Sequence, residues 1–157
     1  MSMILVKDVM HIMEGFEKIR LLKDKEKELY GDYPSMFLKT RKMMNDFIAT
    51  CESNKENFAS ELTIFENTMD VLESRFNDFS KKSIKQDELT QDFINNFNKN
   101  YKDEEFISPE DSVIIGEKAE EMLRNNKVLE SELKEITALN DTLPSKIMDI
   151  FKKAKEV

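Results

Sequence analysis

Few side chains in this sequence could take part in catalysis, and their positions along the chain do not favour an active site. A catalytic thiol needs a nearby base, yet the only cysteine, Cys51, has only His11 as a histidine to serve it. Cys51 lies on an apolar stripe, which indicates a small buried hydrophobic side chain. Acidic neighbours such as Glu120 and Glu121 point to different parts of a solvated helix surface, so they do not form a general acid–base pair. We predict that the protein is not an enzyme.

Metal and cofactor sites are equally poorly supported. One histidine cannot supply a multi-histidine metal site or the carboxylate–histidine ligands of a di-iron bundle. The sequence has no cysteine pair, no glycine-rich phosphate-binding motif and no G-x-S-x-G motif. We therefore expect no metal and no cofactor.

The clearest pattern is a heptad repeat near the C-terminus, and it predicts helix packing. Apolar residues recur at alternating spacings of four and three, which places them on one face of a helix. Asn126 and Asn140 fall at core a positions, where a polar side chain lowers stability but fixes register and strand number. The seam either specifies a partner or packs inside the chain's own bundle, and the sequence favours neither. Its residues are Met122, Asn126, Leu129, Leu133, Ile136, Asn140 and Leu143.

A second apolar stripe in the middle of the chain is rich in Phe and Met. Two-stranded coiled coils prefer Leu, Ile and Val at the seam, so these bulky side chains favour a core of three or four helices. The stripe also allows a pocket for a lipid or another small molecule. Its residues are Phe58, Leu62, Phe65, Met69, Leu72 and Phe76.

These stripes require long helices with few turns. The chain has only 3 Gly and 3 Pro, which supply most turn geometries. We predict an N-terminal helix over residues 1–30, then a long helix from Ser35 to Ser80, about 69 Å in length. Lys55 would be a stutter inside that helix. A polar bend over residues 80–85 would precede a short return helix that ends at Tyr101.

The C-terminal part begins with the strongest local signal. Ser108 is a predicted N-cap, Pro109 fits the first helical position, and the acids after it favour the helix dipole. The helix extends to Asn140, and we expect a break over residues 141–144 rather than a kink at Pro144. The predicted fold is all-α. It is one unit over residues 1–157, an elongated antiparallel helical bundle or coiled coil with two long helices and two or three shorter ones.

The composition of the chain limits the classes of partner that it is expected to bind. The net charge is −8, and residues 103–135 alone contribute −7, so this acidic half should repel nucleic acid and anionic lipid. No stretch is long and apolar enough to span a membrane. One cysteine allows no internal disulfide, which fits a reducing, cytoplasmic location.

The favoured function is a non-enzymatic protein–protein interaction module, a small coiled-coil subunit or adaptor of a larger assembly. Its partners would be proteins bound by helix packing, and self-association is allowed. The alternative is a self-contained bundle that binds one client protein, as an export chaperone, an immunity protein or an inhibitor does. The acidic stretch would then face a basic client.

Overall fold

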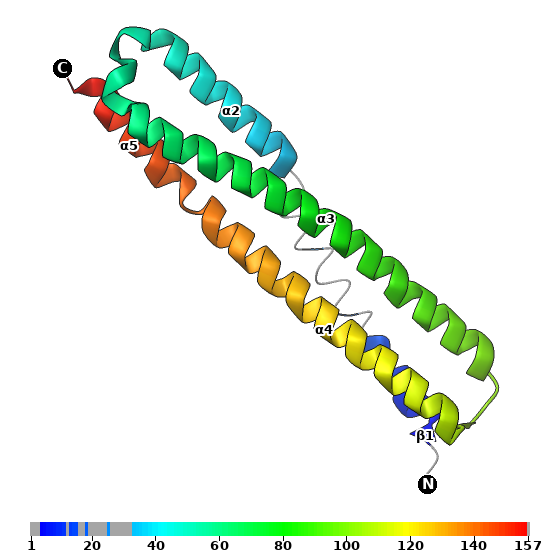
Figure 1. Cartoon of the computed structure of the whole chain (residues 1–157). Coiled ribbons are helices and arrows are strands. Elements are labelled where there is room, and N and C mark those ends of the chain that lie inside the picture. Colours follow the sequence, from blue (N-terminus) through cyan, green and yellow to red (C-terminus); the bar gives the residue numbers. More distant parts are fainter. Residues whose placement is uncertain (1–3, 12, 16–17, 19–24, 26–32, 157) are drawn as a thin grey trace. The chain divides into compact units, whose positions relative to one another are not determined.

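The computed structural model describes residues 4–11, 13–15, 18, 25 and 33–156 (Figure 1). Over these residues the chain is an all-α helical bundle, as predicted, apart from one pair of two-residue strands. Residues 6–11, 13–15 and 18 are helical, and the rest of the helix predicted over residues 1–30 lies outside the described residues, residue 25 excepted. The elements in chain order are β1 (Ile4–Leu5), α2 (Tyr33–Thr50), the 3₁₀ helix η1 (Glu52–Phe58), α3 (Ala59–Tyr101), β2 (Phe106–Ile107), α4 (Pro109–Asn140) and α5 (Leu143–Lys155).

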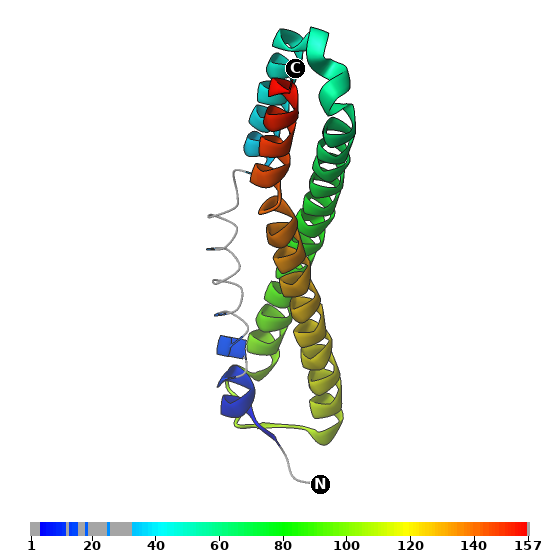
Figure 2. The ribbon, with the colours of Figure 1, turned by 90° about the vertical axis from the view of Figure 1, so that its left-hand side faces the viewer.

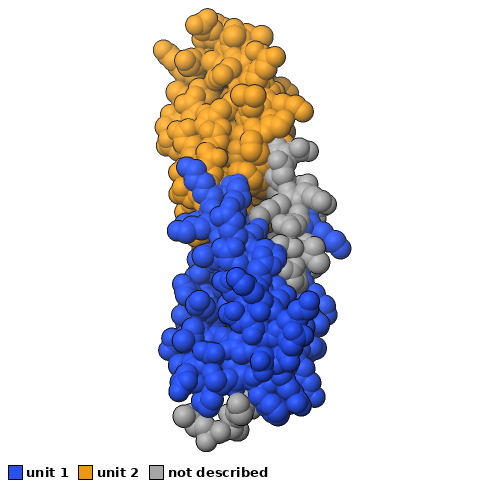
Figure 3. Space-filling model, turned by 90° about the vertical axis from the view of Figure 1, so that its right-hand side faces the viewer, with its two compact units in different colours: residues 1–29, 80–130 blue, residues 30–79, 131–157 orange. Residues whose placement is uncertain are grey.

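The chain divides into two compact units (Figure 3). Unit 1 contains residues 1–29 and 80–130, and unit 2 contains residues 30–79 and 131–157. The two long helices contribute to both units, because α3 has 43 residues and α4 has 32. Each unit therefore has its own core, and the two are described separately.

In unit 2, α2 lies beside the first half of α3 (Figure 1 and Figure 2). Aromatic side chains pack between the two helices. Tyr33 meets Phe76 edge to face with ring centroids 5.3 Å apart, and Arg41 in the middle of α2 donates to Glu73 at 2.7 Å. Because the start of α2 meets a later part of α3 than its middle does, the two helices are antiparallel. Near the end of α2, Phe47 lies 6.0 Å from Phe58, the last residue of η1. Helix α5 covers the same core, where Phe151 lies 4.6 Å from Phe47.

The predicted continuous helix from Ser35 to Ser80 is wrong, because α2 starts at Tyr33 and ends at Thr50, and the chain reverses through η1. The stutter predicted at Lys55 is thus a turn. The η1 sequence is rich in Ser and Asn, whose side chains compete for backbone hydrogen bonds and disfavour a continuous helix. A 3₁₀ helix aligns residues three apart, so Asn54 and Asn57 both donate to carbonyls at the end of α5, those of Ala154 (3.4 Å) and Glu156 (2.8 Å).

The bend predicted over residues 80–85 is also wrong, since α3 continues without a break to Tyr101. The buried side of the helix simply becomes polar there. Ser83, Gln86 and Thr90 are almost fully buried. Polar residues of this kind cost a helix only tenths of a kcal/mol each, so packing decides the outcome.

The start and end of α4 agree with those predicted from the sequence. The Asp111 N–H donates to Ser108 Oγ at 3.2 Å, which is the predicted N-cap bond. The helix ends at Asn140, and α5 begins at Leu143 with Pro144 in its first turn, so the chain breaks rather than kinks. Thr142 occupies the N-cap position of α5, but its hydroxyl donates back to the Leu139 carbonyl at 2.7 Å instead of capping the helix.

Unit 1 packs the N-terminal residues against the second half of α3 and the first half of α4. These two helix segments run antiparallel (Figure 1). Strand β1 pairs antiparallel with β2, with Ile4 opposite Ile107, a contact that the sequence analysis did not predict. The Val6 N–H donates to the Glu105 carbonyl at 2.9 Å and continues this attachment. The buried core comprises Val6, Val9, Met13, Phe97, Ile107 and Met122.

Candidate functional site

A groove within unit 1 lies between α3 and α4. It consists of three adjoining hollows of about 370, 190 and 160 Å³. The first and second share Leu89 and Glu121, and the second and third share Phe93 and Lys118, so the three are continuous. We call this surface the α3/α4 groove. Its lining on α3 extends from Lys82 to Tyr101, a length of about 28 Å along the helix.

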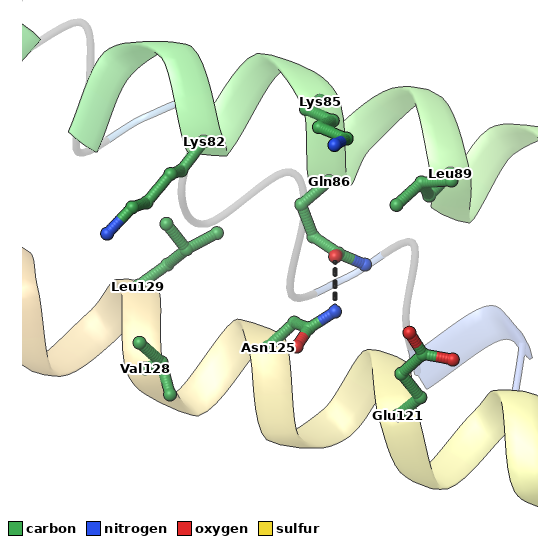
Figure 4. A pocket seen from close by; sticks show the side chains of 8 residues that line it. All are labelled: Lys82, Lys85, Gln86, Leu89, Glu121, Asn125, Val128 and Leu129. Atoms are coloured by element: carbon green, nitrogen blue, oxygen red, sulfur yellow. Dashed lines mark hydrogen bonds between the residues drawn. The ribbon is translucent and has the colours of Figure 1, made fainter. Parts of the chain in front are cut away.

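Amide side chains form the floor of the groove near its Lys82 end (Figure 4). Asn125 Nδ2 donates to Gln86 Oε1 at 3.0 Å, and Gln86 Nε2 donates to Thr90 Oγ1 at 3.2 Å. Gln86 and Thr90 are each 4% exposed. A satisfied buried network of this kind fixes the register of two helices, because sliding either one leaves polar atoms without partners.

The rim of the groove is partly apolar and partly charged. Leu89, Val128 and Ile114 are 47%, 54% and 52% exposed, although each is a large aliphatic side chain. Lys85 and Glu121 are exposed, and neither forms an ion pair within the part of the chain that the structure describes. Exposed apolar side chains beside unpaired charges are typical of a protein contact surface.

The opposite side of the two helices is covered. Asn96 lines the groove, whereas Asn98 lines a separate hollow with Met10 and Met13. Residues two apart point to nearly opposite sides of a helix, since each residue turns it by about 100°. The N-terminal residues thus cover one side of α3, and the groove lies on the other.

The far end of the groove carries a polar latch between its two walls. The Tyr101 hydroxyl donates a short hydrogen bond to the Asp111 carboxylate. Burial, the hydrogen bond to Asp111 and the negative charges of Asp111 and Glu104 together raise the pKa of the Tyr101 phenol to about 12, and burial is the largest of these causes. The latch holds the start of α4 against the end of α3.

The residues predicted as interaction seams face the chain's own interior. Eleven of them are under 9% exposed, and the other two, Phe76 and Asn140, are half-buried. Met122 and Leu129 also contribute to the floor of the groove. Asn140 Oδ1 is buried and has no hydrogen-bond partner within the described residues. The eleven are Phe58, Leu62, Phe65, Met69, Leu72, Met122, Asn126, Leu129, Leu133, Ile136 and Leu143.

Sequence reasoning missed the residues that line the groove. Ile114, Glu121 and Val128 are spaced seven apart at heptad position c, beside the seam. This position normally faces water, so two aliphatic residues there are a signal for a second contact face. Leu89 on α3 is a similar case, since this aliphatic side chain lines the groove and is 47% exposed.

The residues considered for chemistry are not assembled into a reactive site. Cys51 is half-buried, and its Sγ lies 3.8 Å from Thr50 Oγ1. His11 is exposed, and its Nδ1 lies 3.7 Å from a Glu14 carboxylate oxygen. Among the described residues no group of three or more His, Cys, Asp or Glu side chains could hold a metal ion.

Two further observations concern the whole described chain. None of its described helices has the length and apolarity needed to cross a membrane. Comparison with known protein families, with curated proteins and with solved structures finds no match for this chain.

Proposed function

We propose that this chain is a non-enzymatic protein–protein interaction module that binds a helix of its partner in the α3/α4 groove. The observation that supports this proposal is the exposure of Leu89, Ile114 and Val128 along one continuous groove. A groove about 28 Å long fits a helix of roughly 20 residues, and an amphipathic helix would bury these aliphatic side chains. The amide floor supplies a fixed surface on which that helix can lie.

The burial of the heptad seam favours a self-contained bundle as the form of this module. Leu129, Leu133 and Ile136 are 3%, 6% and 1% exposed, so the seam offers little apolar surface to a second chain. A subunit that contributed this seam to an open coiled coil would leave the same side chains exposed in the monomer. We therefore assign partner binding to the groove and internal packing to the seam.

Site-specific photo-crosslinking in the cells that produce the chain tests this proposal. A photoreactive residue replaces Leu89 in the groove, Ile136 in the seam, or Glu120, which is an exposed position outside the groove. We expect one defined product from position 89, identified by mass spectrometry, and none from positions 120 and 136. A product from position 136 alone, or equal products from positions 89 and 120, contradicts the proposal.

A further inference from the structure

Two helices of unit 2 carry the opposite charge to the rest of the chain. Helix α2 has three basic residues and one acidic residue, and α5 has four lysines and one aspartate. These seven basic and two acidic residues give a net charge of +5, whereas the whole chain has a net charge of −8. The two helices are in contact, since the ring centroids of Phe47 and Phe151 lie 4.6 Å apart (Figure 2). A local positive surface therefore lies within an acidic protein.

Exposed methionines lie beside this aromatic contact on both helices. Met43 precedes Phe47 by four residues, so the two lie on the same side of α2. Met36, seven residues before Met43, shares this side as well. Met148 precedes Phe151 by three residues, so these two lie on the same side of α5. The three methionines are 41%, 44% and 51% exposed in chain order, and they form an apolar strip along the contact between the helices.

The strip brings together methionines at a similar level of the two helices. Helix α2 leads into η1, and the Ala154 carbonyl in the last turn of α5 accepts a hydrogen bond from Asn54 of η1 at 3.4 Å. Both helices thus run toward η1 in the same direction. Met43 lies about 6 Å and Met148 about 4.5 Å along the helix axis before the aromatic contact. The two side chains are therefore nearly level with each other.

Lysines from both helices border the strip. Lys39 follows Met36 by three residues, while Lys152 and Lys155 follow Met148 by four and seven residues, which places each lysine on the same side as its methionine. All three lysines are exposed, and none forms an ion pair within the residues that the structure describes. We call this surface the Met/Lys face. It consists of Met36, Lys39, Met43, Met148, Lys152 and Lys155.

We propose that the Met/Lys face binds an amphipathic helix of a partner protein, and that this helix carries acidic residues. Charge complementarity favours an acidic partner, because lysines without an acidic partner border the strip on both helices. Methionine side chains are flexible and polarisable, so they adapt to the apolar side chains of a bound helix. The proposal does not depend on the α3/α4 groove, which lies in unit 1.

The burial of the apolar side of α5 favours a protein partner over an anionic lipid surface. Lysines attract both kinds of partner, but a helix that lies in a membrane interface inserts its apolar side among the lipids. Leu143 and Ile150 of α5 are 6% and 0% exposed, so they face the interior of unit 2. The methionine strip is what α5 and α2 leave exposed, and a packed helix covers such a strip.

Photo-crosslinking in the cells that produce the chain tests this proposal. A photoreactive residue replaces Met43 on the Met/Lys face or Asn67, an exposed residue of α3 outside it. We expect a defined product from position 43 and none from position 67. Mass spectrometry identifies the partner segment that is attached. We expect this segment to have apolar residues at helical spacing and acidic residues beside them.

Charge reversal tests whether the lysines hold this partner. Lys152→Glu combined with Lys155→Glu should lower the yield from position 43 by about tenfold, because two attractive contacts become repulsive. Lys99→Glu combined with Lys102→Glu is the matched control, since these exposed lysines lie at the end of α3 and the net charge changes equally. Lys39→Glu repeats the reversal away from a helix end. Circular dichroism verifies that every variant keeps its helix content.

Three outcomes overturn the proposal. In the first, position 43 gives no product, or no more than position 67 gives. In the second, the attached segment is not acidic or belongs to this chain itself, or the double reversal leaves the yield unchanged. In the third, no protein is attached, but the purified full-length chain sediments with vesicles of phosphatidylserine and phosphatidylcholine through Lys152 and Lys155, which assigns the face to a membrane. Products from position 89 report on the α3/α4 groove separately, so either proposal can fail without the other.

Discussion

The two units of this chain use their helices in opposite ways. In unit 2 the interior is aromatic and apolar, with Tyr33, Phe37 and Phe76 in mutual ring contact. In unit 1 the interior around Gln86 and Thr90 is polar, and large aliphatic side chains lie outside on the rim of the groove. The comparison indicates that the two long helices pack through aromatic side chains in unit 2 and partly through polar side chains in unit 1. The proposed function assigns the exposed aliphatic side chains on the rim of the groove to a partner.

The largest expected effect separates the two regions by stability. Phe65 in unit 2 is 1% exposed, and Phe65→Ala should lower the free energy of unfolding by about 3–5 kcal/mol, because it leaves a cavity. Leu89→Ala on the groove rim should change it by about 0.5 kcal/mol or less. Chemical denaturation followed by circular dichroism measures both. Equal losses would show that Leu89 belongs to a core and that the groove is closed.

The amide floor of unit 1 gives the next largest effect. Asn125→Ala removes the donor to Gln86 and leaves its buried carbonyl oxygen unsatisfied, which should cost about 1–3 kcal/mol. The paired replacement Gln86→Leu with Asn125→Leu removes both polar groups and should cost less than the single change. Denaturation midpoints of the single and double variants measure these two losses of stability. A double variant less stable than the single one would contradict this account, because the amides would then stabilise the fold by more than pairing with each other.

Unit 2 contains a polar contact of its own, and its expected effect is smaller. Arg41 Nε donates to Glu73 at 2.7 Å and a terminal nitrogen donates to Asp70 at 2.6 Å, which raises the pKa of the guanidinium above its ordinary value. Arg41→Ala should cost about 1 kcal/mol, because the pair is only partly buried. Arg75→Ala is the matched control, since its 3.5 Å contact to Glu135 is more exposed. The control should change stability by a few tenths of a kcal/mol.

The smallest effect concerns the latch at the far end of the groove. The folded-state pKa of Tyr101 is raised from 10.0 to about 12, so the fold favours the protonated phenol. This contribution to stability is complete below pH 10.0 and is lost as the pH rises through about 12. Phenolate absorbance in a Tyr30→Phe, Tyr33→Phe variant follows Tyr101 alone. Asp111→Ala should lower the midpoint but leave it above 10.0, because burial is the largest cause of the shift. An unchanged midpoint would show that the latch is absent in solution.

The contrast between the units also explains what the sequence could predict. Apolar periodicity identified the core of unit 2 and the seam of α4, since Phe65, Met69 and Ile136 repeat at helical spacing and are buried. Local capping chemistry predicted the start of α4 at Pro109 and the break after Asn140. Both signals depend on residues close in sequence, so they can be recognised without knowledge of the tertiary structure.

The same reasoning failed where polar residues are buried. The polar residues 80–85 suggested a bend, because the burial of Ser83 by a distant part of the chain is not visible in a local pattern. The reversal at η1 was missed for the related reason that Asn54 and Asn57 find their partners on α5, about a hundred residues away. The groove was missed because its residues lie one position beside the seam. Their exposure depends on which side of α3 and α4 the N-terminal residues cover.

Thiol labelling at two positions tests most directly whether the groove is open and the seam closed. In a Cys51→Ser background, single cysteines replace Leu89 in the groove and Ile136 in the seam, whose native side chains are 47% and 1% exposed. We predict that the thiol at position 89 reacts rapidly and that the thiol at position 136 stays protected. Rapid reaction at position 136 with slow reaction at position 89 would contradict the account, because the heptad seam would then be the open surface.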